Sequence, residues 1–231
     1  MEGNRKIQVA GLLLFLGSMI YSCKDGQKEK INALHAGIEE IEVPEEIKNE
    51  VMPVKDYMQW MQDPKNGFHK VKPMDDIEFV VQYKTPEFII CREERKETLS
   101  DSLVKRKQQE LQGVHYFDLK IQLINGEGEL LKHQLANKEA YENRVRYFAF
   151  EMQKDIQLVD GKDTLPCLLY HFERTYDVAP FCTILLGFNE NKKNIHKPKT
   201  LLVYDKIFNK GLQKFTFKEN KLQTLPKLQT I

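Results

Sequence analysis

The chain has 231 residues, of which 35 are basic and 34 acidic, so its formal net charge at pH 7 is +1. A near-neutral chain lacks the strongly basic surface typical of nucleic-acid-binding proteins, which argues against a nucleic-acid partner. Aromatic residues make up 10% of the sequence, which argues against disorder and predicts a packed core.

The first 23 residues have the parts of a bacterial export signal. Arg5 and Lys6 provide positive charge, and residues 7–21 form an uncharged, mainly apolar run. This run fits the apolar region of a cleaved signal, about 7–15 residues long, and is shorter than the ~20 residues of a membrane-spanning helix. An uncleaved signal anchor or a buried N-terminal helix is the alternative. Ser22 is a small residue directly before Cys23.

This segment resembles the signals of bacterial lipoproteins. The resemblance implies that the Cys23 thiol is diacylglycerylated, that the chain is cut before Cys23, and that the new amine is acylated. Two or three acyl chains anchor a protein stably, whereas one gives marginal binding. Ile20 and Ser22 match the family's pattern, and Tyr21 departs from it. Lys24 stands where some inner-membrane lipoproteins carry Asp, which favours the outer membrane over the inner membrane.

The sequence divides into a signal peptide (1–22), a lipidated cysteine with a charged tether (23–50) and a single β-rich globular domain (51–231). Removing the signal leaves a formally neutral chain. Residues 24–30 (KDGQKEK) are similar to the tethers of many Bacteroidota surface lipoproteins. The motif W-x-x-D-P-x-N-G-F at 60–68 and the segment 82–88 resemble other envelope lipoproteins of the Bacteroidota, a likeness that implies no particular activity.

The first half of the domain predicts two helices and two or three strands. Val54, Tyr57, Met58 and Met61 lie at helical spacing, so we expect a helix over 54–62, ended by a turn over 63–67. The remaining predictions in this half are a strand over 77–83, a break at Thr85-Pro86 with the strand resuming over 88–91, a helix over 98–112 stopped by Gly113, and a strand over 115–123.

The second half predicts mainly strands. We expect a polar helix over 136–143, a long strand from 144 to 158, a turn at 160–161, strands over 165–172 and 182–188, a loop over 189–199, strands over 200–204 and 213–217, and a polar tail. The fold class is therefore α+β and β-rich: an antiparallel sheet or β-sandwich with two or three short helices.

Three cysteines remain after Cys23, so at most one disulfide forms within the domain. Cys91, Cys167 and Cys182 each lie in an apolar run, which predicts buried thiols. A hairpin centred near residue 177 would place Cys182 opposite Phe172 and Cys167 opposite Gly187. This register argues against a bridge between Cys167 and Cys182.

Motifs for catalysis or cofactor binding are missing from the sequence. The six histidines are scattered, with no H-x-x-x-H or C-x-x-C pair, and no phosphate-binding glycine loop occurs. Ser100 and Ser102 begin a predicted helix, where N-capping explains them. We therefore assign no cofactor, no metal site and no catalytic residue.

Aromatic residues near two turns are the candidate binding residues. Tyr57, Trp60 and Phe68 flank the 63–67 turn, and Tyr176 and Phe181 flank the 176–180 segment. Exposed aromatics at turns often anchor interfaces, although core packing would explain them equally well. We predict a membrane-anchored envelope lipoprotein with a binding or assembly role, an accessory subunit that contacts an envelope protein. A lipoprotein inhibitor or immunity factor would share this chemistry.

An envelope hydrolase remains the alternative, with a Cys/His-centred site assembled only in the fold. The distinguishing observation is a pocket lined by two or more residues of one set. That set is His115, His171, Cys91, Cys182, Asp75 and Asp76. A flat aromatic patch over a closed core would instead favour binding.

Overall fold

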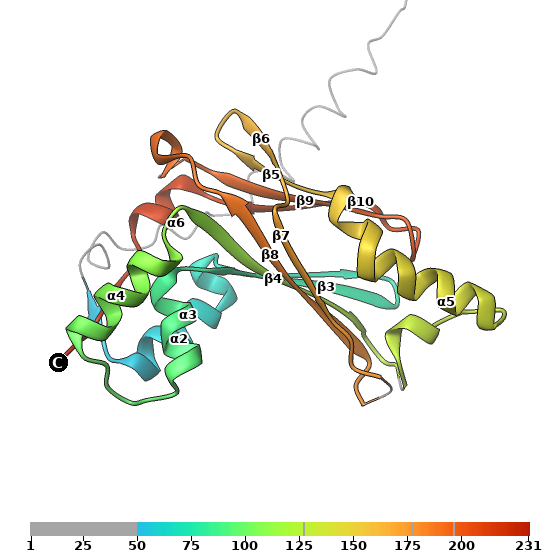
Figure 1. The fold of residues 1–231 in the computed structure, drawn as a ribbon, viewed down its shortest axis with the longest axis horizontal. Helices are drawn as coiled ribbons and strands as arrows, with labels where there is room; N and C mark the ends of the chain where they lie inside the picture. The colour runs from blue at the N-terminus through green and yellow to red at the C-terminus, as the bar shows by residue number, and fades with distance from the viewer. Residues whose placement is uncertain (1–49, 127, 177, 196) are drawn as a thin grey trace, which may run out of the picture. The chain divides into compact units, whose positions relative to one another are not determined.

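The computed structural model describes residues 50–126, 128–176, 178–195 and 197–231. The predicted signal, Cys23 and all of the tether before Glu50 lie outside these residues. The described chain contains two antiparallel sheets packed against each other and five α-helices, which confirms the predicted β-rich α+β class (Figure 1).

The larger sheet has five strands, in the order β2 (His69–Met74), β3 (Ile77–Lys84), β4 (Val114–Leu123), β8 (Phe181–Asn189) and β7 (Leu169–Glu173). The smaller sheet has four, in the order β10 (Gly211–Phe217), β9 (Lys199–Asp205), β5 (Ile156–Asp160) and β6 (Asp163–Pro166). A separate parallel pair joins β1 (Val51–Met52) to β11 (Lys227–Leu228).

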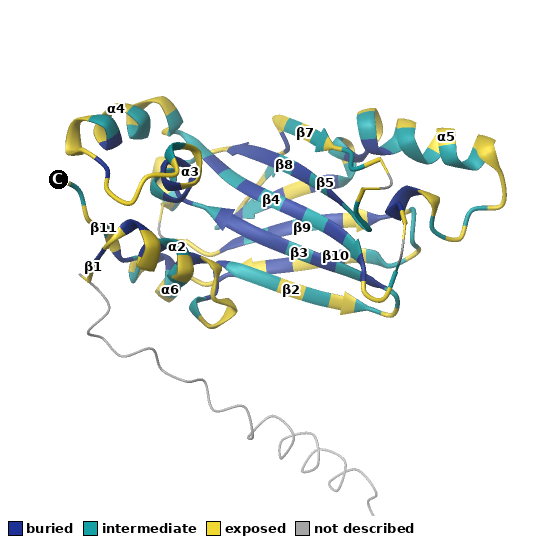
Figure 2. Cartoon of the chain, turned by 90° about the horizontal axis from the view of Figure 1, so that it is seen from below, coloured by how far each residue is buried: buried dark blue, intermediate teal, exposed yellow. Residues whose placement is uncertain are grey.

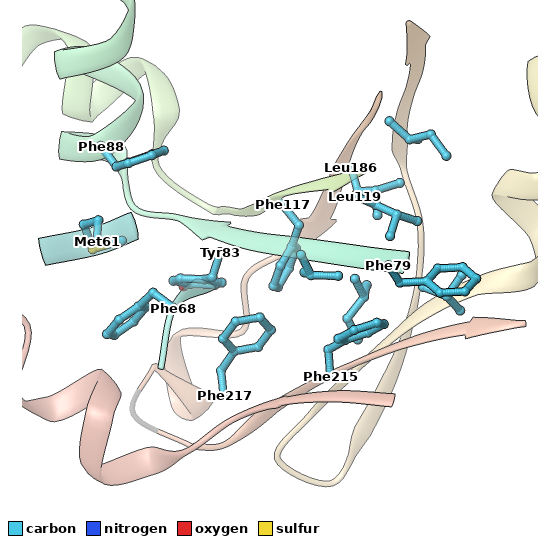
Figure 3. Packing of buried hydrophobic residues seen from close by; sticks show 14 of the residues in the cluster. Met61, Phe68, Phe79, Tyr83, Phe88, Phe117, Leu119, Leu186, Phe215 and Phe217 are labelled. Carbon is cyan, nitrogen blue, oxygen red and sulfur yellow. The ribbon is translucent and has the colours of Figure 1, made fainter. Parts of the chain in front are cut away.

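The core lies between the two sheets because alternate residues of each strand point inward. Along β4, Phe117, Leu119 and Ile121 are buried, while the residues between them are half-buried. The Phe117 ring centroid lies 5.5 Å from that of Phe217, which joins the larger sheet to β10 of the smaller one (Figure 3). The predicted strand over 115–123 is confirmed.

Helices α2 (Val54–Gln62), α3 (Pro86–Glu94) and α4 (Asp101–Leu111) gather at one end of the sandwich with α6 (Glu219–Gln223) (Figures 1 and 2). The predictions of α2 and α4 are confirmed. The prediction that Phe88–Cys91 resumes a strand is wrong, because Thr85 accepts a hydrogen bond from Phe88 N and begins α3. Pro86 occupies the first helical position, where its missing N–H costs nothing.

Helix α5 (Lys138–Arg146) lies at the other end (Figure 2). The predicted strand over 144–158 is wrong for most of its length. Helical structure continues through a π-helical turn at Tyr147–Glu151 and a 3-10 turn at Met152–Asp155. Only the last part of the predicted strand is extended, as β5.

The predicted strand over 165–172 divides between the two sheets. Its first part belongs to β6 and its second part to β7, with Cys167 and Leu168 in the crossover. Strand β7 does form a hairpin with β8, but Leu169 pairs with Gly187 and Phe172 with Ile184. The observed register is therefore two residues away from the predicted one. It keeps the same side chains on each face because strands have a period of two.

Strands β9 and β10 confirm the two predicted C-terminal strands. Strand β2, helix α6 and strand β11 were not predicted, and the last two replace much of the expected polar tail. None of the helices in the described ranges is long and apolar enough to cross a membrane.

Candidate functional site

A cleft of about 490 Å³ opens at the α5 end of the sandwich. We call it the turn cleft. Four separate segments line it: the β2–β3 turn, the residues after a 3-10 turn at Leu130–Lys132, α5 and the β9–β10 turn. Its polar lining comprises Asp75, Asp76, His133, Gln134, Arg144, Asn209 and Lys210.

Three lining residues have a left-handed backbone without being glycine. The φ angles are 57° at Asp75, 51° at Gln134 and 59° at Asn209. Asp and Asn tolerate this region in tight turns, whereas Gln adopts it less readily. Backbone strain of this kind gathers at functional sites, so its concentration here marks the cleft as a candidate.

Asp76 is the centre of the charge network in the cleft. Its Oδ2 lies 2.5 Å from His133 Nε2 and accepts a hydrogen bond from Gln134 Nε2 at 2.9 Å. Lys210 Nζ donates to Asp75 Oδ2 at 2.9 Å and to Asp76 Oδ1 at 3.3 Å. The hydrogen bond from His133 lowers the pKa of Asp76, and the bond to Asp75 raises the pKa of Lys210. Both groups are therefore charged at neutral pH.

Arg144 joins α5 to the segment that carries His133. Its guanidinium donates to His133 O at 2.7 Å and to Leu131 O at 3.3 Å, and its central carbon lies 5.2 Å from the Phe208 ring centroid. Burial lowers the pKa of Arg144. The lysine side of the cleft is held by Asp205, whose carboxylate accepts hydrogen bonds from the backbone N–H groups of the β9–β10 turn.

The chemistry of the cleft suits recognition of charged groups. Its lining holds two carboxylates, two cations and one imidazole, and no hydroxyl or thiol side chain. The Asp76–His133 pair also has the geometry of a carboxylate that orients a general base. No hydroxyl or thiol side chain lines the cleft, so this pair would act by activating water.

A second polar cluster is closed to solvent. His115 is 2% exposed, and the side chains of Asp160 and Lys199 are fully buried. Lys199 Nζ lies 2.7 Å from Asp160 Oδ1, and His115 Nε2 lies 3.7 Å from Asp160 Oδ2. The Tyr83 hydroxyl lies 3.2 Å from His115 Nδ1. Burial, followed by the charge of Lys199, lowers the pKa of His115. Without solvent access, this cluster is a structural element of the sandwich.

The cysteines do not form a reactive centre. Cys91, Cys167 and Cys182 are free and buried, and burial raises the pKa of Cys91 and Cys167 to about 11 and that of Cys182 to about 12. Thiols of this kind stay protonated and unreactive near neutral pH. None of the three lines the turn cleft.

Cys182 is also separated from the candidate histidines His115 and His171. Cys182 pairs with Ile121 on the inner face of the larger sheet, six residues along β4 from His115, or about 20 Å in an extended strand. His171 is exposed on the outer face of the same sheet, opposite Leu185. The structure therefore does not assemble the expected Cys/His centre from these residues. The acidic members of the set, Asp75 and Asp76, do share a cleft.

The first group of predicted binding aromatics belongs mainly to the core. Tyr57 and Phe68 are each 1% exposed, so neither ring reaches a surface partner. The Tyr57 hydroxyl lies 2.7 Å from Thr85 Oγ1, and the Phe68 ring lies 5.5 Å from the half-buried ring of Trp60. These contacts correct the expectation of exposed anchors for Tyr57 and Phe68, because the helical end needs both rings for packing.

The second group lies nearer the surface. Tyr176 is 66% exposed and stacks on Arg174, whose guanidinium carbon is 4.2 Å from its ring centroid. The same guanidinium lies 5.3 Å from Tyr141 of α5, so this loop belongs to the end that carries the turn cleft. Phe181 is half-buried on the outer face of the larger sheet, with Lys120 Nζ 4.2 Å from its ring centroid.

The outer face of the larger sheet has its own shallow groove, of about 530 Å³. Asp118 lies on its floor and pairs with Lys84 at 2.7 Å and with Arg92 of α3. His69 Nδ1 lies 3.0 Å from Gln82 Oε1 at the groove edge. These polar groups are largely paired, and the groove lacks the strained turns of the turn cleft.

The sequence identified Asp75 and Asp76 but missed His133, Arg144 and Lys210. The fold joins these residues across long separations, and the Asp75–Lys210 pair spans 135 positions. One local signal was available. Asn209-Lys210-Gly211 has turn composition between two predicted strands, so Lys210 was identifiable as a turn residue. His133 and Arg144 had no comparable signal.

Comparisons with protein-family models, curated proteins and solved structures give no match to this chain. Among the described residues, no group of three or more His, Cys, Asp or Glu side chains is arranged to hold a metal ion.

Proposed function

We propose that this chain is an exported lipoprotein, anchored through Cys23 in the cell envelope with the outer membrane favoured. In this proposal it acts as an accessory subunit that binds an envelope protein. The main support for this role is the turn cleft, which presents carboxylates and cationic side chains together at one end of the domain. A charged segment of a partner would replace some of the ion pairs that the cleft now makes internally.

The surroundings of the cleft support a binding role. Tyr176 and Val178 are 66% and 88% exposed in the loop beside α5, so an exposed aromatic and an apolar side chain lie at the cleft end. Interfaces commonly combine such anchors with a polar surround. Arg144 donates hydrogen bonds to backbone carbonyls of the cleft, and Asp205 accepts hydrogen bonds from its backbone N–H groups, so the cleft is held in place and the ordering cost of binding is lowered.

A second candidate function is hydrolysis by an activated water. Asp75 and Asp76 both line the cleft, which meets the observation that would favour an enzyme, and His133 lies against Asp76. In that case the imidazole would accept the proton of the attacking water while Asp76 orients the ring. The absence of a hydroxyl or thiol nucleophile from the lining makes this candidate the weaker one.

The anchor is tested by expressing the full chain and a Cys23→Ala variant in a bacterial host and measuring the intact mass of the envelope-associated protein. We expect acylated protein beginning at Cys23 in the wild type and no acylation in the variant. Cys91→Ala is the matched control, because it removes a cysteine without touching the signal. Unmodified wild-type chain that retains residues 1–22 would refute the lipoprotein proposal.

The cleft is tested by placing a photo-crosslinking residue at Asn209 and, as a control, at exposed Lys162 on the β5–β6 turn. We expect one defined adduct from Asn209 in intact cells, lost when Asp76→Asn and Lys210→Met are added. Equal adducts from both positions would contradict the binding proposal. Purified protein that hydrolyses an ester, amide or glycoside, with the activity lost in both His133→Gln and Asp76→Asn, would establish the second candidate.

A further inference from the structure

Three lysines meet beside the turn that follows α2, at the end of the domain opposite the turn cleft. We call Lys70 and Lys221 the lysine cluster, and Lys218 adds its charge beside them. Lys70 is near the start of β2, and the other two lie at the start of α6. A Cβ atom built on Gly67 would lie 3.8 Å from Lys70 Nζ and 3.3 Å from Lys221 Cγ. Both side chains therefore cover the same glycine.

The cluster concentrates positive charge. Burial and the charges of Lys218 and Lys221 lower the pKa of Lys70, and burial and Lys218 lower that of Lys221. Within the described part of the chain, the contacts of the Lys70 and Lys221 ammonium groups are a ring face and a backbone carbonyl. Lys70 Nζ is 5.9 Å from the Phe217 ring centroid, and Lys221 Nζ is 3.4 Å from Lys65 O.

The nearest acidic residue of α6 is engaged elsewhere. Glu219 lies 3.7 Å from Lys197 Nζ and accepts a hydrogen bond from Gln223. The repulsion between Lys70 and Lys221 is therefore not relieved by a described carboxylate. Like charges in a partly buried setting are unfavourable until an anion joins them.

The position of the cluster suggests the source of that anion. Strand β1, where the described chain begins, lies at the same end as α2 and α6 (Figures 1 and 2). The chain from Cys23 thus enters the domain at the lysine end. Residues 24–49 span up to about 90 Å when fully extended, so an anchor at Cys23 alone would not set the orientation of the domain.

We propose that the lysine cluster binds the anionic phospholipid headgroups of the membrane that holds Cys23. This contact would hold the α2–α6 end against the bilayer and direct the turn cleft away from it. The inference rests on the proposed lipid anchor for its membrane, and on charge complementarity for its ligand. The binding free energies of basic side chains near an anionic bilayer add, so each lysine raises the affinity by about fivefold.

The chain's single tryptophan provides the readout. Trp60 is half-buried, and its carbonyl accepts a hydrogen bond from Asn66 in the turn beside the cluster. The full lipidated protein is reconstituted in phosphatidylcholine vesicles with and without phosphatidylglycerol, each containing a lipid with a fluorescence quencher at headgroup depth. We expect strong quenching of Trp60 only with phosphatidylglycerol.

The variant Lys70→Gln/Lys221→Gln should lower the ratio of docked to undocked domain about 25-fold. The matched control Lys154→Gln/Lys162→Gln, which removes the same charge from exposed positions elsewhere, should leave that ratio unchanged. Equal quenching without phosphatidylglycerol, or in the cluster variant, would overturn the proposal. Loss of Trp60 quenching on adding inorganic phosphate at constant ionic strength would identify free phosphate as the ligand. This result would also overturn the headgroup proposal.

The two proposals fail separately in this experiment. Intact mass reports acylation of Cys23 on the same sample. A Cys23→Ser chain keeps the apolar residues 7–21 and is reconstituted in the same vesicles without acyl chains. Lysine-dependent quenching in this chain would support headgroup binding even if the lipid anchor were refuted. If a lipidated chain shows the same Trp60 quenching with and without the Lys70→Gln/Lys221→Gln changes, headgroup binding is refuted and the lipid anchor is not.

Discussion

At the scale of residues, the buried charges of the sandwich are held by backbone carbonyls as well as by one another. Lys199 is fully buried and pairs with Asp160, and its ammonium donates to Asn194 O at 2.5 Å and Lys197 O at 2.9 Å. A buried ion pair offsets its desolvation only when its remaining hydrogen-bonding groups find partners. Here the 3-10 turn at Lys192–Asn194 and the residues after it supply carbonyl partners to the Lys199 ammonium, whereas Asp160 Oδ2 has no hydrogen-bond partner among the described residues. The ion pair therefore fastens this loop onto β9.

His115 should make the stability of the domain depend on pH. Its pKa is lowered in the folded state by burial and by Lys199, with Asp160, Glu190 and the Tyr83 hydroxyl also facing the ring. Below pH 6.5, the ordinary pKa of the group, the unfolded chain takes up a proton that the folded chain resists. We expect the urea unfolding midpoint to fall between about pH 7 and about pH 5.

The matched variant for this prediction is His115→Gln, which keeps a polar group but does not titrate. Its midpoint should be lower than that of the wild type at pH 7 and should change less between about pH 7 and about pH 5. Asp76 does not affect this comparison. Its pKa is lowered from the ordinary value of 3.8, so its protonation changes the stability only in stronger acid. Equal pH slopes in the two proteins would rule out His115 as the source.

At the scale of elements, helix α3 shows where local sequence signals misled. Thr85-Pro86 breaks a strand in most contexts, and Phe88, Ile89, Ile90 and Cys91 form an apolar run of strand length. The same Thr and Pro also make a good helix start. A continuous apolar run does not distinguish a buried helix from a buried strand. Only the packing of α3 against α2 and α4 decides the outcome, and this is a long-range effect.

Thr85 should be a sensitive position for the stability of this end. Its hydroxyl accepts from Phe88 N at 3.2 Å and lies 2.7 Å from the Tyr57 hydroxyl, and both contacts are buried. Thr85→Val removes the cap and leaves the Tyr57 hydroxyl without this partner. We expect a loss of about 2–4 kcal/mol in the free energy of unfolding, measured by urea denaturation.

Ser100→Ala is the control, because Ser100 caps α4 in the same way at an exposed position, with Leu103 N 3.4 Å from its oxygen. Its loss should be about 0.5–1 kcal/mol, because water replaces the missing partner. Similar losses in the two variants would contradict the role assigned to the buried Tyr57 contact.

At the scale of the whole molecule, the sequence predicts the sandwich better than it predicts the candidate site. Alternation in β3 and β4 and the turn at 63–67 are local patterns, and the structure confirms them. The turn cleft depends instead on four segments that meet only after the sheets have packed. His133 and Arg144 lie in polar stretches whose positions are set by α5, so no nearby pattern identifies them.

The two ends of the domain should act independently. Lys70 and Asp75 lie near opposite ends of β2, five residues or about 17 Å apart in an extended strand, and no described side chain contacts both the cluster and the cleft. Changes at sites this far apart are usually additive. We expect Asp76→Asn/Lys210→Met to remove the Asn209 adduct without affecting Trp60 quenching. We expect Lys70→Gln/Lys221→Gln to reduce Trp60 quenching without affecting the Asn209 adduct.

The combined four-site variant completes this test. Its urea midpoint should shift by the sum of the shifts of the two double variants, because the altered groups lie at opposite ends of the sandwich. Loss of the Asn209 adduct in the lysine-cluster variant alone would contradict independence. It would mean that partner binding at the cleft requires the domain to be held by its lysine end. A membrane-dependent adduct would then be expected, with phosphatidylglycerol required for crosslinking in reconstituted vesicles.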